Sequence, residues 1–322
     1  MLFDKLKNIQ NPDKFQGVNK SKNYFEGWYF KLIDATETYA IAIIPGISMS
    51  PKGEKNAFIQ VLDGKDCKTD YISFNADLFQ ADKEHFSISI EDNNFSDKSI
   101  RLNLDNLKGT VSFKNTQPIE KTVLSPGIMG WYSYVPFMEC YHGIVSMNHG
   151  LEGTLEINGQ TIDFTGGKGY IEKDWGKSFP NSWIWMQTNH FKYHEASLMA
   201  SVAKIPWMGN HFIGFLISFW LDGEFYRFAT YTGAKIKSAK VHDDRVELYF
   251  KNKPFELYIT AIKGATGELV SPIQGNMAGK VNESLDAKIH FKLLKNGQLI
   301  FDDWGRNAGL EVAGEYQELL TN

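Results

Sequence analysis

Two carboxylates near the middle of the chain have the residue types and spacing of an acid–base pair. Residues 170–175 read YIEKDW. If they form a strand, Tyr170, Glu172 and Asp174 share one face, and neighbouring same-face residues lie about 6.6 Å apart at Cα. In an apolar pocket, repulsion and desolvation raise the pKa of one carboxyl, so a neutral acid stands beside an anion. On a solvent-exposed edge of the sheet, the same two carboxylates would be ordinary surface residues. The sequence alone does not decide between a pocket and an exposed edge.

Further candidates for proton chemistry lie elsewhere in the chain. His142 follows Glu139 in residues 123–150, a stretch rich in Gly, Pro, aromatic residues and His. We interpret His142 as a group for positioning or proton transfer, with a structural histidine bonded within a loop as the alternative. Glu26 shares a predicted strand face with Trp28 and is a third candidate acid after Asp174 and Glu172.

The sequence predicts neither a metal ion nor a cofactor. His190 and His194 have the spacing of a zinc pair on a helix. Residues 183–191 read as a strand, however, and four residues along a strand span roughly 13 Å, too far for one ion. The two cysteines, Cys67 and Cys140, are too few for a disulfide framework or a Cys-based zinc site.

Strands must position these side chains, because the chain is predicted to be all-β. It contains 23 Phe, 14 Tyr and 8 Trp, and aromatic residues favour strands. Polar and apolar residues alternate at 86–90, 100–104 and 246–250. Asp-Gly or Asn-Gly pairs beginning at 63, 158, 222 and 296 mark hairpin turns. Helical periodicity is restricted to two short stretches, residues 3–9 and 315–320.

The two halves of the chain resemble each other in order. Residues 58–64 resemble 217–223, residues 100–109 resemble 255–264, and residues 158–162 resemble 296–300. These matches indicate an internal duplication that gives two β domains, 1–180 and 181–322. The first half carries an extra segment within residues 123–150. Because loops on a rigid frame carry sites, this insertion is either functional or a flap that closes a barrel end.

Composition excludes several classes of protein. The 322 residues are 43% hydrophobic and 22% charged, as expected of a globular chain. A net charge of -4 gives no basic footprint for nucleic acid. The longest apolar run, residues 213–221, is about half a membrane span, and the first residues lack the apolar core of a signal peptide. We therefore expect a cytoplasmic protein with no transmembrane segment and no nucleic-acid partner.

Three blocks of sequence resemble the tocopherol cyclase family. They are NYFEGWYFK at 23–31, VPFMECYHG at 135–143 and YIEKDWGKSFP at 170–180, and residues 183–191 extend the likeness. The resemblance covers nearly the whole chain from about residue 22. It implies two tandem lipocalin-like antiparallel β-barrel domains, related to carotenoid hydratase-like barrel proteins, in agreement with the duplication.

The resemblance also implies a reaction. The family closes a chromanol ring when the phenol oxygen of a prenylated hydroquinol adds to the nearest alkene of its tail. A carboxylic acid protonates the alkene in a water-poor pocket, where aromatic faces stabilise the developing cation. Asp174 is then the first candidate acid, Glu172 the second and Glu26 the third, with His142 orienting the acid or the phenol. The alternative function is a non-catalytic carrier of an apolar ligand.

An isoprenoid ligand requires an apolar lining, and a membrane-borne substrate would bring the protein into peripheral contact with lipid. Alternate residues of a strand face one way, so the aromatic runs supply the lining. The predicted ligand-binding residues are Trp28, Phe30, Tyr170, Trp183, Trp185 and Glu139.

Overall fold

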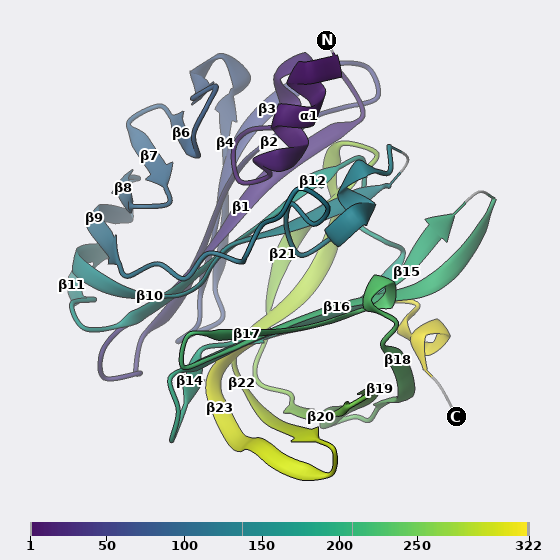
Figure 1. Cartoon of the computed structure of the whole chain (residues 1–322). Coiled ribbons are helices and arrows are strands. Elements are labelled where there is room, and N and C mark those ends of the chain that lie inside the picture. Colours follow the sequence, from purple (N-terminus) through teal and green to yellow (C-terminus); the bar gives the residue numbers. More distant parts are fainter. Residues whose placement is uncertain (1, 137, 208, 321–322) are drawn as a thin grey trace. The chain divides into compact units, whose positions relative to one another are not determined.

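The computed structural model describes residues 2–136, 138–207 and 209–320. In this part of the chain nearly all regular structure is strand, arranged as two large antiparallel sheets (Figure 1). The all-β prediction is therefore confirmed. Of the two predicted helices, one is α1 (Leu2–Gln10), and the other is a short 3-10 turn, η5 (Tyr316–Leu319).

The chain forms two compact units. Unit 1 is Met1–Phe179 with Leu269–Lys280, and unit 2 is Pro180–Glu268 with Val281–Asn322. Unit 1 thus includes a short piece from late in the sequence. Gln60 holds this piece through two hydrogen bonds with Val270, at 2.8 and 3.0 Å. The amide of Gly275 also donates to the carbonyl of Lys177 at 2.7 Å.

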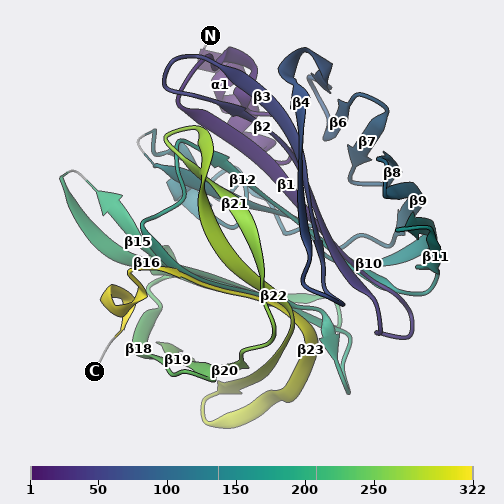
Figure 2. The ribbon, with the colours of Figure 1, turned by 180° about the vertical axis from the view of Figure 1, so that it is seen from behind.

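The first sheet belongs to unit 1, and its strands run in the order β4-β3-β2-β1-β12-β10-β9-β8-β7-β6-β5, with β11 paired to β10. The first strand therefore pairs with the last, and β1 to β4 lie side by side (Figure 2). The strands are β1 (Tyr24–Ile33), β2 (Ala40–Met49), β3 (Lys55–Asp63), β4 (Thr69–Asn75), β5 (Phe79–Ala81), β6 (Ser87–Ile90), β7 (Asn93–Ser96), β8 (Ser99–Asn103), β9 (Leu107–Lys114), β10 (Cys140–Ile157), β11 (Gln160–Asp163) and β12 (Lys168–Gly176).

The second sheet has the order β17-β16-β15-β13-β23-β22-β20-β19-β18, in which the first strand again pairs with the last. The predicted duplication is consistent with this shared order and stays a prediction. The strands are β13 (Ser182–Thr188), β14 (His190–Phe191), β15 (Ala196–Trp207), β16 (Asn210–Leu221), β17 (Glu224–Ala229), β18 (Lys235–Val241), β19 (Arg245–Asn252), β20 (Phe255–Ile262), β21 (Gly267–Ile273), β22 (Asn276–Lys295) and β23 (Gln298–Gly314).

The prediction of closed barrels is wrong for the described residues, because neither sheet closes on itself. In unit 1 the sheet ends at β4 and β5, which are joined by the 3-10 turn η2 (Ala76–Leu78). In unit 2 it ends at β17 and β18, joined by η4 (Thr230–Thr232). In both units the two end strands, although consecutive in the sequence, are not paired with each other in the described residues.

Each unit has its own apolar core, which explains the alternation in the sequence. In unit 1, Trp28, Phe30 and Leu32 of β1 are fully buried and pack into one cluster with the strands that follow. In unit 2, Ile184 and Met186 of β13 have the same role. No helix in the described residues is both long and apolar enough to cross a membrane.

Candidate functional site

The candidate site is built on one face of two neighbouring strands of unit 1. The predicted strand at 170–175 is present as β12, and its register with β1 and β10 is continuous through residues 172–174. Asp174 stands opposite His142 of β10, and Glu172 stands opposite Ile144. Because side chains alternate along a strand, Tyr170, Glu172 and Asp174 share the face to which His142 belongs.

Four side chains on this face form a continuous polar chain, which we call the site cluster: Tyr170, Glu172, His142 and Asp174. His142 Nδ1 lies 3.0 Å from Asp174 Oδ1, within hydrogen-bond distance. Its Nε2 lies 3.5 Å from Glu172 Oε2, which is an ion-pair contact and makes no hydrogen bond in the described structure. The Tyr170 hydroxyl donates to Glu172 Oε2 at 2.5 Å.

His142 carries a positive charge at neutral pH in this arrangement. Burial alone would lower its pKa, but the charges of Asp174 and then Glu172, with the hydrogen bond to Asp174, outweigh burial and raise the pKa to about 9. Burial and the Glu172 charge raise the pKa of Tyr170, so its hydroxyl stays protonated and can donate. An imidazolium is thus held between two carboxylates.

The members of the site cluster differ in their exposure to solvent. The Asp174 side chain is 27% exposed, against 12% for His142 and 6% for Glu172. Asp174 is therefore the more accessible of the two carboxyl groups, and Glu172 is the more buried. A carboxyl paired with a protonated imidazole can both deliver and recover a proton, which is the requirement of general acid–base catalysis.

The same side chains could also face a cation. Ligand atoms of His142, Glu172 and Asp174 all lie within 4.8 Å of one another. One nitrogen and two carboxylate oxygens suit a divalent transition metal. In the described structure, however, Nδ1 of His142 and Oε2 of Glu172 are engaged within the site cluster. The sequence-based expectation of no metal stays a prediction.

Cys140 is a neighbour of the site that the sequence analysis did not select. Its Sγ lies 3.7 Å from Asp174 Oδ1, and burial followed by the Asp174 charge raises the pKa of its thiol. Strand alternation could have found it, because Cys140 precedes His142 by two residues on β10. The thiol remains protonated beside the carboxylate.

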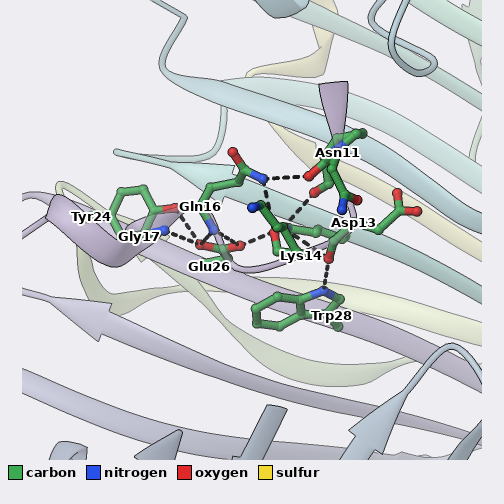
Figure 3. Close-up of polar contacts among 10 residues, drawn as sticks. Asn11, Asp13, Lys14, Gln16, Gly17, Tyr24, Glu26 and Trp28 are labelled. Atoms are coloured by element: carbon green, nitrogen blue, oxygen red, sulfur yellow. Dashed lines mark hydrogen bonds and ion pairs between the residues drawn. The ribbon is translucent and has the colours of Figure 1, made fainter. Parts of the chain in front are cut away.

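Glu26 lies apart from the site cluster, on the opposite face of the sheet. It forms an ion pair with Lys173 at 2.6 Å (Nζ–Oε1), and both side chains are fully buried. Lys173 separates Glu172 from Asp174 in the sequence, so it projects from the reverse side of β12. The Glu26 carboxylate is also bonded to the amides of Gln16 and Gly17 (Figure 3).

The predicted aromatic lining is divided between two faces. Trp28 is opposite Lys173 and Phe30 is opposite Ile171, whereas Tyr170 is opposite Lys31. Trp28 and Phe30 therefore point into the apolar core of unit 1, away from the face that carries Tyr170. The expectation that these three residues line one cavity is corrected. The pairing register of β1 with β12 explains the division. Even-numbered residues of β1, such as Trp28 and Phe30, pair with odd-numbered residues of β12, whereas Tyr170 is even-numbered and lies on the other face.

The two remaining tryptophans of the predicted lining, Trp183 and Trp185, are on β13 in unit 2, on the face opposite its apolar core. Trp185 is buried and Trp183 is half-buried. The indole nitrogen of Trp183 donates to Glu311 Oε2 at 2.5 Å. Ile184 and Met186, which alternate with them, belong to the core. Their predicted part in ligand binding stays a prediction.

Glu139 has a backbone role next to the site. Its carbonyl accepts hydrogen bonds from the amides of Lys177 and Ser178, which fixes the chain just after β12. At Gly176 the backbone has a φ of +152°, and a Cβ there would lie 2.1 Å from the Glu139 carbonyl oxygen. Only glycine fits this close approach. Phe137, in the same sequence block, lies outside the described residues.

Comparison with known proteins identifies the family. The fold is lipocalin-like: over 90% of the chain it resembles a putative AttH from Nitrosomonas europaea, with a TM-score of 0.56, 16% identity and 92% of that structure covered. CghA in its complex with Sch210972 gives a TM-score of 0.56 at 9% identity, over 90% of this chain and 88% of that one. Residues 120–314 match the family described as tocopherol cyclase-like, and the chain belongs to that family.

Two curated relatives are plant proteins. The chloroplastic tocopherol cyclase of Zea mays is 27% identical over 198 residues, which is 58% of this chain and 41% of that protein. The probable chloroplastic tocopherol cyclase of Oryza sativa subsp. japonica is 33% identical over 197 residues, or 58% and 42%. The match thus spans about two fifths of these relatives. The family-matched range includes His142, Glu172 and Asp174.

Proposed function

We propose that the protein cyclises a prenylated hydroquinol, or a similar isoprenoid substrate, by acid catalysis at the site cluster. The observation that carries this proposal is the imidazole of His142 held 3.0 Å from Asp174 and 3.5 Å from Glu172 in a tocopherol cyclase-like chain. Family membership favours this reaction over the carrier alternative, since the cluster provides the proton chemistry that a carrier does not need.

The reaction is an isomerisation in which one proton enters and one leaves. The proton shared by His142 Nδ1 and Asp174 passes through the Asp174 carboxyl to the less substituted alkene carbon. A C–H bond forms, the π bond breaks, and a tertiary carbocation remains. The phenol oxygen adds to this cation and closes the ring, and the phenol proton returns to the Asp174–His142 pair. No redox partner is needed.

The other members of the site cluster support that pair. Glu172, together with Asp174, holds His142 in its protonated form, and Tyr170 donates to Glu172 so that this buried anion is stabilised. The Nε2–H of the imidazolium is buried, makes no hydrogen bond in the described structure and lies 3.5 Å from Glu172 Oε2, so it adds to the attraction between the imidazolium and this carboxylate.

Turnover of a prenylated hydroquinol, measured as chromanol by mass spectrometry in oxygen-free reducing buffer, tests this proposal. Asp174→Asn keeps the size of the side chain but cannot supply the proton, so we expect a loss of at least about 10²-fold. Glu172→Gln is the matched carboxyl variant and should lose less. Each assay is run with and without a chelator to test whether a metal ion contributes.

Two outcomes would change the assignment. A folded Asp174→Asn protein with full activity, together with an inactive Glu172→Gln protein, would move the acid to Glu172. Wild-type protein that binds the hydroquinol, detected by tryptophan fluorescence, without converting it would support the carrier alternative. Identification of a prenyl quinol or chromanol that co-purifies with the native protein would define the substrate class directly.

A further inference from the structure

The Glu26–Lys173 ion pair lies behind the catalytic strand, on the core side of unit 1. Lys173 is the residue between Glu172 and Asp174, so one stretch of β12 backbone carries the site cluster on one face and this cation on the other. Both side chains are fully buried. Burial lowers the pKa of Lys173, against the opposing effect of the Glu26 charge.

The ammonium group of Lys173 has a complete set of acceptors. Its three N–H donors are matched by Oε1 of Glu26 at 2.6 Å, the carbonyl of Pro12 at 2.7 Å and the carbonyl of Lys14 at 2.5 Å. The rings of Trp28 and Trp175 lie 4.7 and 4.8 Å from Nζ, within the range of a cation–π contact. Two of these acceptors come from the N-terminal segment, which we define as residues 11–17.

The carboxylate of Glu26 is satisfied by the same N-terminal segment. It accepts hydrogen bonds from the amides of Gln16 and Gly17 at 2.9 to 3.0 Å, and from the Tyr24 hydroxyl at 2.5 Å (Figure 3). Carbonyls of the segment therefore face the cation and its amides face the anion. The ion pair therefore binds backbone atoms of the N-terminal segment, and these hydrogen bonds do not depend on the side chains of the segment.

Further contacts anchor the N-terminal segment across unit 1. The indole nitrogen of Trp28 donates to the Asp13 carbonyl at 3.0 Å, as Figure 3 shows. At the turn between β5 and β6, Asn11 donates to the Glu84 carbonyl at 2.9 Å, and Lys14 donates to the Lys83 carbonyl at 2.7 Å. The segment is thus fixed both to β1 and to a distant turn of the same unit.

We propose that Lys173 is a positioning residue for the site cluster: by clamping β12 to the N-terminal segment, it fixes the backbone from which Glu172 and Asp174 project. This inference rests on the proposed function. Without the cation, the Glu26 carboxylate and two backbone carbonyls would converge with no donor between them. These buried oxygens repel one another and draw in water, which displaces β12. A small displacement separates Asp174 from His142, and catalysis is sensitive to misplacements of that size.

The test compares three variants by the titration of His142, followed by NMR of its imidazole, and by turnover. Lys173→Met leaves Glu26 without its cation, whereas the double variant Lys173→Met/Glu26→Gln removes both charges at similar volume. We expect the pKa of His142 to fall by more than one unit in the folded double variant, and kcat to fall at least about 10-fold with KM little changed. Asn11→Ala is the control, because it removes a segment contact distant from β12 and should leave both readouts unchanged.

The outcomes separate this inference from the proposed function. The His142 titration needs no substrate, so it tests the clamp even if the wild-type protein converts no hydroquinol. A folded double variant with the wild-type His142 titration would overturn the inference. If neither Lys173 variant folds, hydrogen exchange in the wild-type protein decides. Amides of Gln16 and Gly17 that exchange as slowly as those of β12 support the clamp, and exchange at the rate of an unstructured peptide overturns it.

Discussion

His142 on β10 and Asp174 on β12 are 32 residues apart in the sequence, yet Nδ1 of one lies 3.0 Å from Oδ1 of the other. The two residues are direct partners in the antiparallel ladder, so the backbone register itself creates the contact. Glu172 joins from the next same-face position on β12. The histidine thereby receives two negative neighbours, and its pKa rises to about 9.

This raised pKa predicts how stability depends on pH. The folded pKa of His142 lies above the ordinary value of 6.5, so its stabilising effect is fully present below about pH 6.5 and is lost as the pH rises through 9. The shift corresponds to roughly 3 kcal/mol at most. Urea unfolding of the wild type and of His142→Gln at a series of pH values checks this. If the difference in unfolding free energy between the two proteins stayed constant from pH 6 to 10, the prediction would be contradicted.

Tyr170→Phe should weaken the site without destroying the fold. The substitution removes the hydroxyl that donates to Glu172 Oε2 at 2.5 Å and leaves the ring in place. A buried carboxylate that loses a donor costs about 1–3 kcal/mol. We therefore expect the unfolding free energy of Tyr170→Phe to be about 1–3 kcal/mol lower than that of the wild type, and its turnover to be about 10-fold lower. Tyr141→Phe, whose hydroxyl bonds the Val135 carbonyl instead, is the matched control and should keep most of its turnover.

Gly176→Ala should be one of the more damaging alanine substitutions in unit 1. The new Cβ would lie 2.1 Å from the Glu139 carbonyl oxygen, and the backbone φ is +152°. Strain of this kind costs at least about 2 kcal/mol. Gly159→Ala also has a positive φ but meets nothing within 4 Å, so it should cost only about 1 kcal/mol. Thermal unfolding of both proteins would show the difference, and equal melting temperatures would refute the steric argument.

The expected peripheral membrane contact can be tested on the segment that precedes β10. Val123, Leu124 and Trp131 are 75%, 80% and 49% exposed, respectively, which is unusual for large apolar side chains. We expect the wild type to co-sediment with phospholipid vesicles and a Val123→Ser/Leu124→Ser variant to remain largely in the supernatant. Leu299→Ser, at a 58% exposed position in unit 2, is the control. Equal sedimentation of all three would remove this segment as the contact.

The sequence predicted the strand that carries the site cluster, because strand alternation is a local property. Residues 170–175 could be read as a strand, and the shared face of Tyr170, Glu172 and Asp174 followed from their spacing. The same alternation correctly grouped Trp28 with Phe30. It could not place that pair relative to Tyr170, because the pairing register of β1 with β12 joins residues about 140 positions apart and depends on the packing of the whole sheet.

Other features escaped prediction for related reasons. The partner of Glu26 is Lys173, and nothing local to either residue indicates it, because the pair forms only when two distant strands align. The open ends of the two sheets coincide with the 3-10 turns after β4 and β17, which were not predicted from the sequence. His142 was identifiable as a candidate from its residue type and segment, but its charge state depends on Asp174 and Glu172 across the ladder.

The late piece of unit 1, residues 269–280, has a consequence for how the protein is made. Gln60 pairs with Val270 across 210 positions, so the ribosome must synthesise most of the chain before unit 1 has all its parts. A gene cut at residue 180 would encode unit 1 without this piece, exposing Gln60 and the carbonyl of Lys177. Expression of the first half alone should therefore give an aggregation-prone product, whereas co-expression of the two halves should recover soluble protein.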